Sequence, residues 1–149
     1  MTDDTPGRGE ERFVDGYLLY LLARASSIAS AEFHGRAKAR GVAVPVWRIL
    51  AVLKGTEGVT VGELATRCLA NQPTITKTVD RMQAQGLVTR LADTGDRRRV
   101  LVRLTPAGET LVDELIADAR AHQARLVAAM GTSESRVLVE ALQRLIASA

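Results

Sequence analysis

The residues best suited to chemistry lie in one basic segment, residues 71 to 103. It contains seven basic and three acidic residues, a net charge of +4, whereas the whole chain of 149 residues carries only +3. Such a local excess of positive charge is typical of a protein that binds a polyanion, most often nucleic acid. A solvated basic surface is the alternative interpretation of the charge alone.

Polar residues gather at the start of a helix predicted over residues 72 to 85. Asn71 is a favoured N-cap residue, and Gly86 is a typical stop. Because Ile75, Val79 and Met82 recur at helical spacing, one side faces a core. An α-helix fits the major groove, where residues near its N-terminus reach base edges. The side chains available for that role are Gln72, Pro73, Thr74, Thr76, Lys77 and Arg81.

A β-hairpin is predicted after this helix. Residues 87 to 91 and 99 to 104 are short and branched, and the Asp-Thr-Gly-Asp sequence between them has the composition of a turn. Arg97 and Arg98 follow this turn directly. An arginine at the tip of a hairpin can enter a narrow minor groove, where the negative potential is strong.

Helices are predicted on both sides of these two elements, so the fold class is mainly α with a small β-hairpin wing. Thr60 and Glu63 form a capping box for a short helix. The helices are predicted over residues 13 to 39, 46 to 54, 61 to 69, 106 to about 130 and 133 to 147. The helix over residues 106 to about 130 carries a heptad-like seam of Val112, Leu115, Ala119, His122, Leu126 and Ala129. The helix over residues 133 to 147 is predicted to direct three leucines inward, which are Leu138, Leu142 and Leu145.

Several classes of protein are disfavoured by composition. A single cysteine, Cys68, excludes an internal disulfide, and two histidines are too few for a metal site. Residues 1 to 12 form a polar, acidic and disordered tail without the apolar run of a signal peptide or membrane anchor. We therefore expect a cytoplasmic protein with no membrane partner, no metal and no cofactor.

Cys68 is also the one candidate nucleophile, paired with His34 or His122 as base. The sequence has no glycine-rich phosphate loop, no nucleophile elbow and no cluster of metal ligands. Cys68 is predicted to face inward beside Leu64, Ala65 and Leu69, where a thiol is inert. We therefore do not expect an enzyme.

Two motifs resemble those of the MarR family of winged helix-turn-helix transcription regulators. The family's wing signature is Asp-x-Arg, five residues, then Leu-Thr-x-x-Gly, and Asp96-Arg97-Arg98 and Leu104-Thr105-Pro106-Ala107-Gly108 match it at every fixed position. The predicted recognition helix is also similar to the family's, with Lys77 where Arg is commoner and Met82 where Leu is commoner. The motif-bearing part covers roughly residues 60 to 108.

The resemblance implies a homodimer that binds double-stranded DNA. Residues 45 to 105 would form the winged helix-turn-helix, and residues 13 to 44 and 106 to 149 a helical dimerisation region. The operator would be pseudo-palindromic, with half-sites roughly 34 Å apart. Asp96 would orient the wing through Arg98, and either Arg97 or Arg98 would reach the minor groove. Repression is the commoner mode of action in the family.

The resemblance also implies control by a ligand, because many relatives release DNA when a small phenolic or anionic molecule binds between the dimer helices and the winged domain. The candidate cleft residues are Phe33, His34, Trp47 and Arg48. Core packing is the alternative role for Phe33 and Trp47, and a surface ion pair is the alternative for Arg48. The competing function for the whole chain is a winged-helix protein-interaction adaptor without sequence-specific DNA binding.

Overall fold

The computed structural model describes residues 12–149, so residues 1–11 of the predicted acidic tail lie outside the described residues. The chain divides into two compact units, residues 1–32 and residues 33–149. The first contains α1 (Phe13–Gly16) and most of α2 (Leu18–Ala39). The prediction of one continuous helix here was wrong, because Tyr17 is extended, with φ −81° and ψ 110°. Gly16, a poor helix former, precedes this break.

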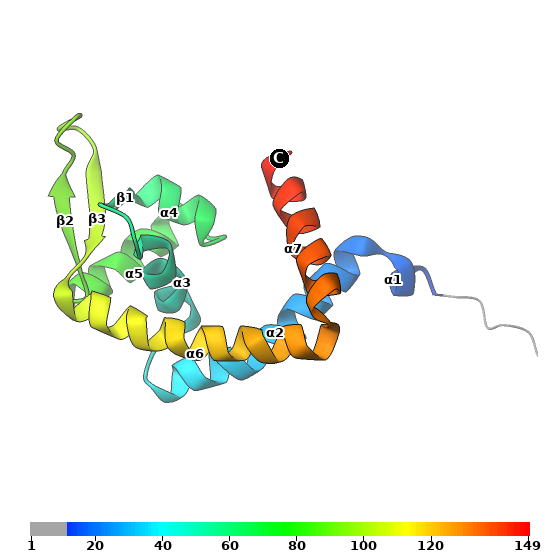
Figure 1. Ribbon diagram of the computed structural model, residues 1–149. Coiled ribbons are helices and arrows are strands. Elements are labelled where there is room, and N and C mark those ends of the chain that lie inside the picture. The colour runs from blue at the N-terminus through cyan, green and yellow to red at the C-terminus, as the bar shows by residue number, and fades with distance from the viewer. Residues whose placement is uncertain (1–11) are drawn as a thin grey trace, which may run out of the picture. The chain divides into compact units, whose positions relative to one another are not determined.

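The second unit contains a helical cluster beside a small sheet (Figure 1). It begins with the end of α2, and its other elements follow the predicted order. Its helices are α3 (Val44–Leu53), α4 (Val61–Arg67), α5 (Gln72–Ala84), α6 (Pro106–Met130) and α7 (Thr132–Ala147). Its strands are β1 (Val59–Thr60), β2 (Val88–Ala92) and β3 (Val100–Leu104). None of the helices within residues 12–149 is long and apolar enough to cross a membrane.

Side-chain caps explain where α4 and α5 begin. The Oγ1 atom of Thr60 accepts from the backbone N–H of Glu63 at 3.2 Å, and Asn71 Oδ1 accepts from Thr74 N–H at 2.9 Å. Each bond satisfies a backbone donor that the first helical turn leaves unpaired. The predicted capping box is only half formed, because the Glu63 carboxylate binds Arg67 Nε at 3.1 Å instead of returning to the cap.

The sheet is antiparallel with the order β1-β3-β2, and the predicted hairpin is its β2–β3 pair. Val88 pairs with Leu104 and Ala92 with Val100, so the strands are in register from the base towards the tip. Figure 1 shows the loop of this hairpin projecting beyond the helices. Strand β1 was not predicted, because two residues are too short to show a period-two pattern.

The second unit contains a closed hydrophobic core formed by α3, α4, α5, the sheet and the first half of α6, which together are called the winged-helix part below. Apolar side chains of α3, α4, α5, the sheet and the first half of α6 meet there, and the predicted inward residues of α5 are among them. The largest fully buried residues are Ile49, Leu50, Leu53, Leu64, Ile75, Met82, Leu115, Val79, Val88, Val102 and Val112. Cys68 is buried as predicted, with 3% of its surface exposed, whereas its neighbour Leu69 points out of the core, contrary to expectation.

The Leu-Thr-x-x-Gly motif joins the base of the hairpin to α6. Thr105 caps α6 by accepting from Gly108 N–H at 3.1 Å, and its hydroxyl donates to the carbonyl of Gly86 at 2.6 Å. A Cβ atom on Gly108 would collide with the backbone carbonyl of Leu87. Glycine is therefore required at the end of the motif because helix and hairpin backbones pass too closely for a side chain.

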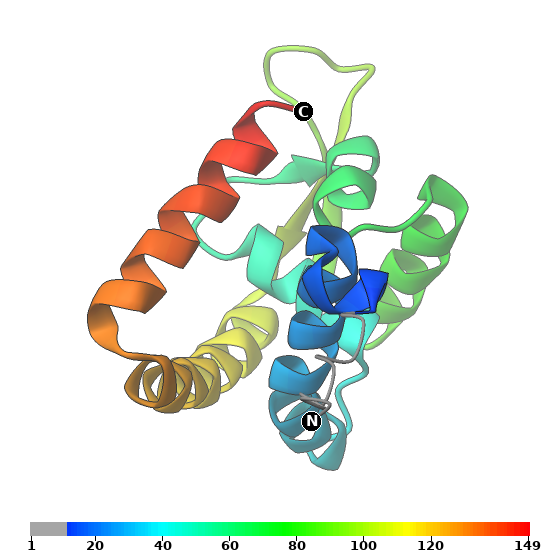
Figure 2. The ribbon, with the colours of Figure 1, turned by 90° about the vertical axis from the view of Figure 1, so that its right-hand side faces the viewer.

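The terminal helices differ from the winged-helix part in what they bury. The seam on α6 is buried at Val112, Leu115 and His122, but Ala129 near its end is exposed. The chain bends at Gly131 into α7, as Figure 2 shows. The prediction that the α7 leucines face inward fails within one chain for two of the three, since Leu138 and Leu145 remain 40% and 49% exposed, whereas Leu142 is half-buried.

Candidate nucleic-acid interface

The outer face of α5 carries all of the side chains proposed for base contact. Ile75, Val79 and Met82 fix the opposite face in the core. The hydroxyl of buried Thr78 donates to the Thr74 carbonyl at 2.9 Å, so it is satisfied within the helix. All six candidates are exposed, and the first three of them lie in the first turn: Gln72, Pro73, Thr74, Thr76, Lys77 and Arg81.

Arg90 on β2 fastens the hairpin to α5. Its guanidinium donates to the Asp80 carboxylate at 2.5 Å and to the Gln83 side-chain oxygen at 2.6 Å. Sequence reasoning counted Arg90 in the basic segment and missed this positioning role. One feature of the sequence could have indicated this ion pair: Asp80 lies on the same predicted helix face as Lys77 and Arg81. An acidic side chain on that face disfavours DNA binding unless a nearby cation neutralises it.

The tip of the wing is shaped by its two acidic residues. Asp96 Oδ1 accepts from the backbone N–H of Arg98 at 3.0 Å and from Arg98 Nε at 3.4 Å. The Asp93 carboxylate accepts from Gly95 N–H and lies 3.8 Å from the Arg99 guanidinium. The Asp96–Arg98 bond expected from the motif is therefore present, while the side chain of Arg98 is still 92% exposed.

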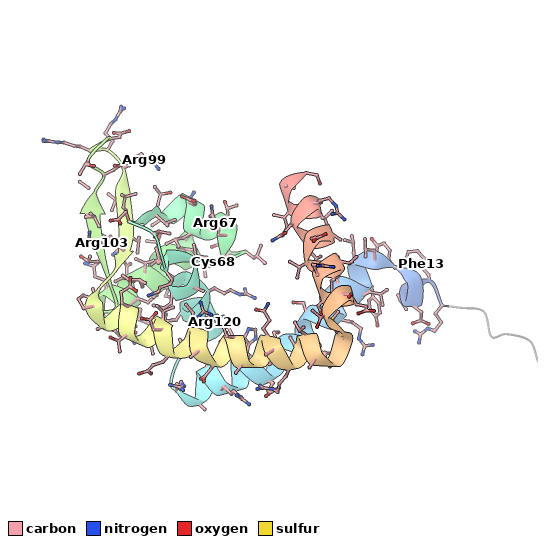
Figure 3. The ribbon with its side chains drawn as sticks, in the orientation of Figure 1. Phe13, Arg67, Cys68, Arg99, Arg103 and Arg120 are labelled. Atoms are coloured by element: carbon pink, nitrogen blue, oxygen red, sulfur yellow. The ribbon has the colours of Figure 1, made fainter. Side chains whose placement is uncertain are left out.

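The ion pairs change the charge available to a polyanion. Arg90, Arg98 and Arg99 each have an acidic partner. Within residues 12–149, no ion pair involves the other four cations of the basic segment, which are Lys77, Arg81, Arg97 and Arg103. Figure 3 shows Arg99 near the tip of the hairpin and Arg103 further down β3. The unpaired positive charge is thus divided between α5 and the wing.

The candidate effector residues lie around the ring of Phe33, which is buried at the end of α2. The Trp47 ring meets it edge-on at 4.8 Å between centroids, and the rings of His34 and His122 each lie 6.2 Å away. Three of the four predicted cleft residues are therefore together. His122 joins them, although sequence reasoning assigned it only to the α6 seam.

Arg48, the fourth predicted cleft residue, is exposed, and its charge acts on Cys68. Burial raises the pKa of the Cys68 thiol, and the nearby Arg48 cation offsets only part of this effect. A raised pKa is the opposite of what activates a cysteine nucleophile. No three His, Cys, Asp or Glu side chains within the described part of the chain are placed to hold a metal ion.

The fold and this surface define the class as winged helix-turn-helix: two short helices, of which the second presents a polar face, followed by a basic hairpin. Comparison with known proteins narrows the class. A model of the MarR family matches residues 40–99. The crystal structure of the MarR family transcriptional regulator SPO1453 from Silicibacter pomeroyi DSS-3 is 43% identical, with a TM-score of 0.84, over 93% of this chain and 98% of that one. The chain therefore belongs to the MarR family of DNA-binding transcription regulators.

Two further proteins illustrate the range of relatives. The homoprotocatechuate degradative operon repressor of Escherichia coli is 30% identical over 94 residues, which are 63% of this chain and 64% of that protein. NadR in complex with 4-hydroxyphenylacetate shares the fold at 23% identity, with a TM-score of 0.80 over 95% of this chain and 97% of that one. The chain spans about half to two thirds of the length of several of the curated relatives it matches.

Proposed function

We propose that the chain binds a pseudo-palindromic operator as a homodimer, represses transcription there, and is released by a small phenolic or anionic effector. The observation that carries the proposal is the division of unpaired cations between α5 and the wing, Lys77 and Arg81 on one and Arg97 on the other. Two basic elements joined by the Arg90 link match a major groove and the minor groove beside it.

On the operator, Gln72, Thr74 and Thr76 would read base edges, since side chains at a helix N-terminus lie deepest in the groove. Pro73, Lys77 and Arg81 flank them and supply the groove-facing surface and charge. Asp96 would hold the Arg98 backbone in the turn and leave its side chain, or that of Arg97, to enter the minor groove.

The case for a homodimer is the apolar surface that the terminal helices leave uncovered. On α7, Val137, Leu138 and Ile146 are exposed, and in the first unit Phe13, Leu18 and Ile28 are exposed. Several exposed large apolar side chains on one helix are characteristic of an interface in a soluble protein. Residues 13–44 and 106–149 are accordingly proposed as the dimerisation region, and residues 45–105 as the DNA-binding domain.

The case for an aromatic or anionic effector is the ring cluster of Phe33, Trp47, His34 and His122. Edge-on and tilted aromatic contacts suit a phenolic ring, and Arg48 beside Trp47 in sequence offers a charge for a carboxylate. The name of the E. coli relative, a degradative operon repressor, and the 4-hydroxyphenylacetate in the NadR complex support both repression and this class of ligand.

Fluorescence anisotropy of the purified chain against a duplex from upstream of its own coding region tests the proposal. We expect saturable binding with a steep salt dependence, because bound phosphates release counterions. The Arg98→Ala variant should bind roughly ten- to a hundredfold more weakly. Arg120→Ala, which removes the same charge from α6, is the matched control and should bind as the wild type does.

Two results would count against the proposal. If the chain bound this duplex no more tightly than scrambled DNA, and a selection from random sequences also enriched no site, the adaptor function would replace it. If Arg98→Ala and Arg120→Ala lost affinity equally, the binding would depend on overall charge and the wing would have no specific role.

A further inference from the structure

A leucine occupies the turn of the helix-turn-helix in a conformation that normally requires glycine. Leu69 has φ 56°, and within residues 12–149 it is the single residue other than glycine with a positive φ. In this left-handed conformation the Cβ atom crowds the following carbonyl oxygen. Leu69 therefore has a large side chain in a backbone conformation that is unfavourable for any residue with a Cβ atom.

The hydrogen bonds show that the fold imposes this conformation. Ala70 N–H donates to the Ala65 carbonyl at 3.0 Å and Leu69 N–H to the Thr66 carbonyl at 3.4 Å. This pair of bonds is the Schellman motif that ends α4, and it places Leu69 at the position after the cap, which glycine usually fills.

Two other helices of the same chain end in the same motif and do use glycine. At the end of α2, Gly41 has φ 76°, and Val42 N–H donates to the Ala37 carbonyl at 2.9 Å. At the end of α5, Gly86 has φ 73°, and Leu87 N–H donates to the Met82 carbonyl at 3.0 Å. Of these three helix ends, only the end of α4 has a residue other than glycine, Leu69, in the left-handed position.

The Leu69 side chain packs against little of the rest of the chain. It is 83% exposed, more than any other exposed large hydrophobic residue described, while Cys68 beside it is buried. Figure 3 shows Arg67 and Cys68 at this end of α4. The strain is therefore not offset by packing within the protein, and a contact outside the chain is the remaining physical reason for a leucine here.

The position of Leu69 favours DNA as that contact. It stands two residues before Asn71, whose side chain caps α5, and exposed Gln72 and Thr74 follow at once. Between residues 33 and 99 it is also the one exposed large hydrophobic residue. A protein interface needs an apolar patch, whereas a lone apolar group among polar ones matches DNA, whose apolar groups are thymine methyls and deoxyribose.

We propose that Leu69 is a DNA-binding residue of this regulator and makes an apolar contact with the operator, to a thymine methyl or a deoxyribose, where α5 enters the major groove. The proposal rests on the proposed DNA-binding function. It implies that stability is sacrificed at the turn between α4 and α5 for an interaction that exists only in the complex.

The test compares Leu69→Gly and Leu69→Ala with the wild-type full-length chain. Leu69→Gly should melt about 2 to 4 °C higher, because glycine removes the backbone strain. Both variants should bind the operator roughly three- to tenfold more weakly, as expected for loss of a partly buried leucine side chain. Neither should change the salt dependence, since no charge is lost.

A duplex with deoxyuridine in place of thymidine separates the two DNA groups. If the wild type binds the deoxyuridine duplex more weakly than the thymidine duplex, and Leu69→Ala binds both equally, the contact is to the thymine methyl. If Leu69→Ala binds more weakly than the wild type by the same factor on both duplexes, the contact is to the deoxyribose. Wild-type affinity in Leu69→Gly would overturn the proposal, as would a loss that followed weaker dimerisation. Failure of the wild type to bind any operator would overturn the proposed function as well, so the two failures are distinguishable.

Discussion

The winged-helix part and the last helix bury their apolar residues to very different degrees. In the core formed by α3, α4, α5 and the sheet, Leu50, Ile75 and Val102 are completely or almost completely buried. On α7, Leu138 and Leu145 are between two fifths and one half exposed, although their spacing is as regular. Both regions have the helical pattern of an amphipathic element, but only the first closes its core within one chain.

The difference shows that an apolar stripe predicts that a helix face is buried, but it does not identify the surface against which that face packs. The winged-helix part is compact enough for its stripes to meet one another, so its hydrophobic core is closed within one chain. The stripe on α7 is left for a surface that the chain does not supply itself, and we attribute it to a second copy.

A charge placed on the exposed apolar stripe of α7 should have the largest effect, and it tests whether this stripe is an interface. Leu138→Glu should weaken dimerisation about 30-fold or more, since a charge at the centre of an apolar interface cannot be solvated. Operator affinity should fall with it, because one half-site alone is bound weakly. Sedimentation velocity and anisotropy measure the two effects. Gln143→Glu, on the same helix at an exposed polar position, should change neither.

A change inside the closed region should instead affect folding. Gly108→Ala forces a side chain against the Leu87 carbonyl and should lower the free energy of unfolding by about 1 to 3 kcal/mol in urea titrations. Gly95→Ala is the control, because a Cβ there meets only the Asp93 carboxylate at 3.7 Å. Equal effects of the two substitutions would show that the close approach of helix and hairpin is unimportant.

Loss of the Arg90 link between the hairpin and α5, the two elements proposed to contact DNA, should have a smaller effect. Arg90→Ala removes the bonds to Asp80 and Gln83 and leaves the Asp80 carboxylate facing the DNA. We expect roughly three- to tenfold weaker operator binding with dimerisation unchanged. Asp80→Asn together with Arg90→Ala should recover part of the loss. An Arg90→Ala variant with wild-type affinity would show that the link has no role.

The smallest expected effect concerns the Cys68 thiol within the closed core. Because burial raises its pKa, the reactive thiolate is scarce until the pH exceeds the ordinary thiol range. At pH 8, iodoacetamide should modify Cys68 more than about tenfold more slowly in the native chain than in urea. Native and unfolded rates that agree would contradict a closed core around α4 and weaken the contrast with α7.

The elements of the winged-helix part could be predicted from the sequence because their signals are local. Asn71 and Thr105 begin helices, and the Asp-Thr-Gly-Asp turn separates two strands, where the residue types themselves favour those structures. Strand β1 could not be predicted, because its pairing with β3 is non-local. The direction of Leu138 failed for a related reason: periodicity reports a face but not its partner.

The candidate site divides in the same way. Exposed residues such as Lys77 and Arg98 follow from helix phase and a local turn, and their assignment to DNA stays a prediction. The Arg90–Asp80 link and the place of His122 beside Phe33 depend on contacts between elements, so no local pattern identified them. Leu69 was misplaced because α4 ends earlier than its apolar pattern suggested, at Arg67.

The most direct test of the account is the mass of the protein–operator complex, measured by light scattering after size-exclusion chromatography. We expect two chains per duplex that carries both half-sites. We also expect a duplex with one half-site scrambled to be bound much more weakly. A stable complex of one chain per duplex, with affinity indifferent to the second half-site, would contradict the proposed dimeric operator binding.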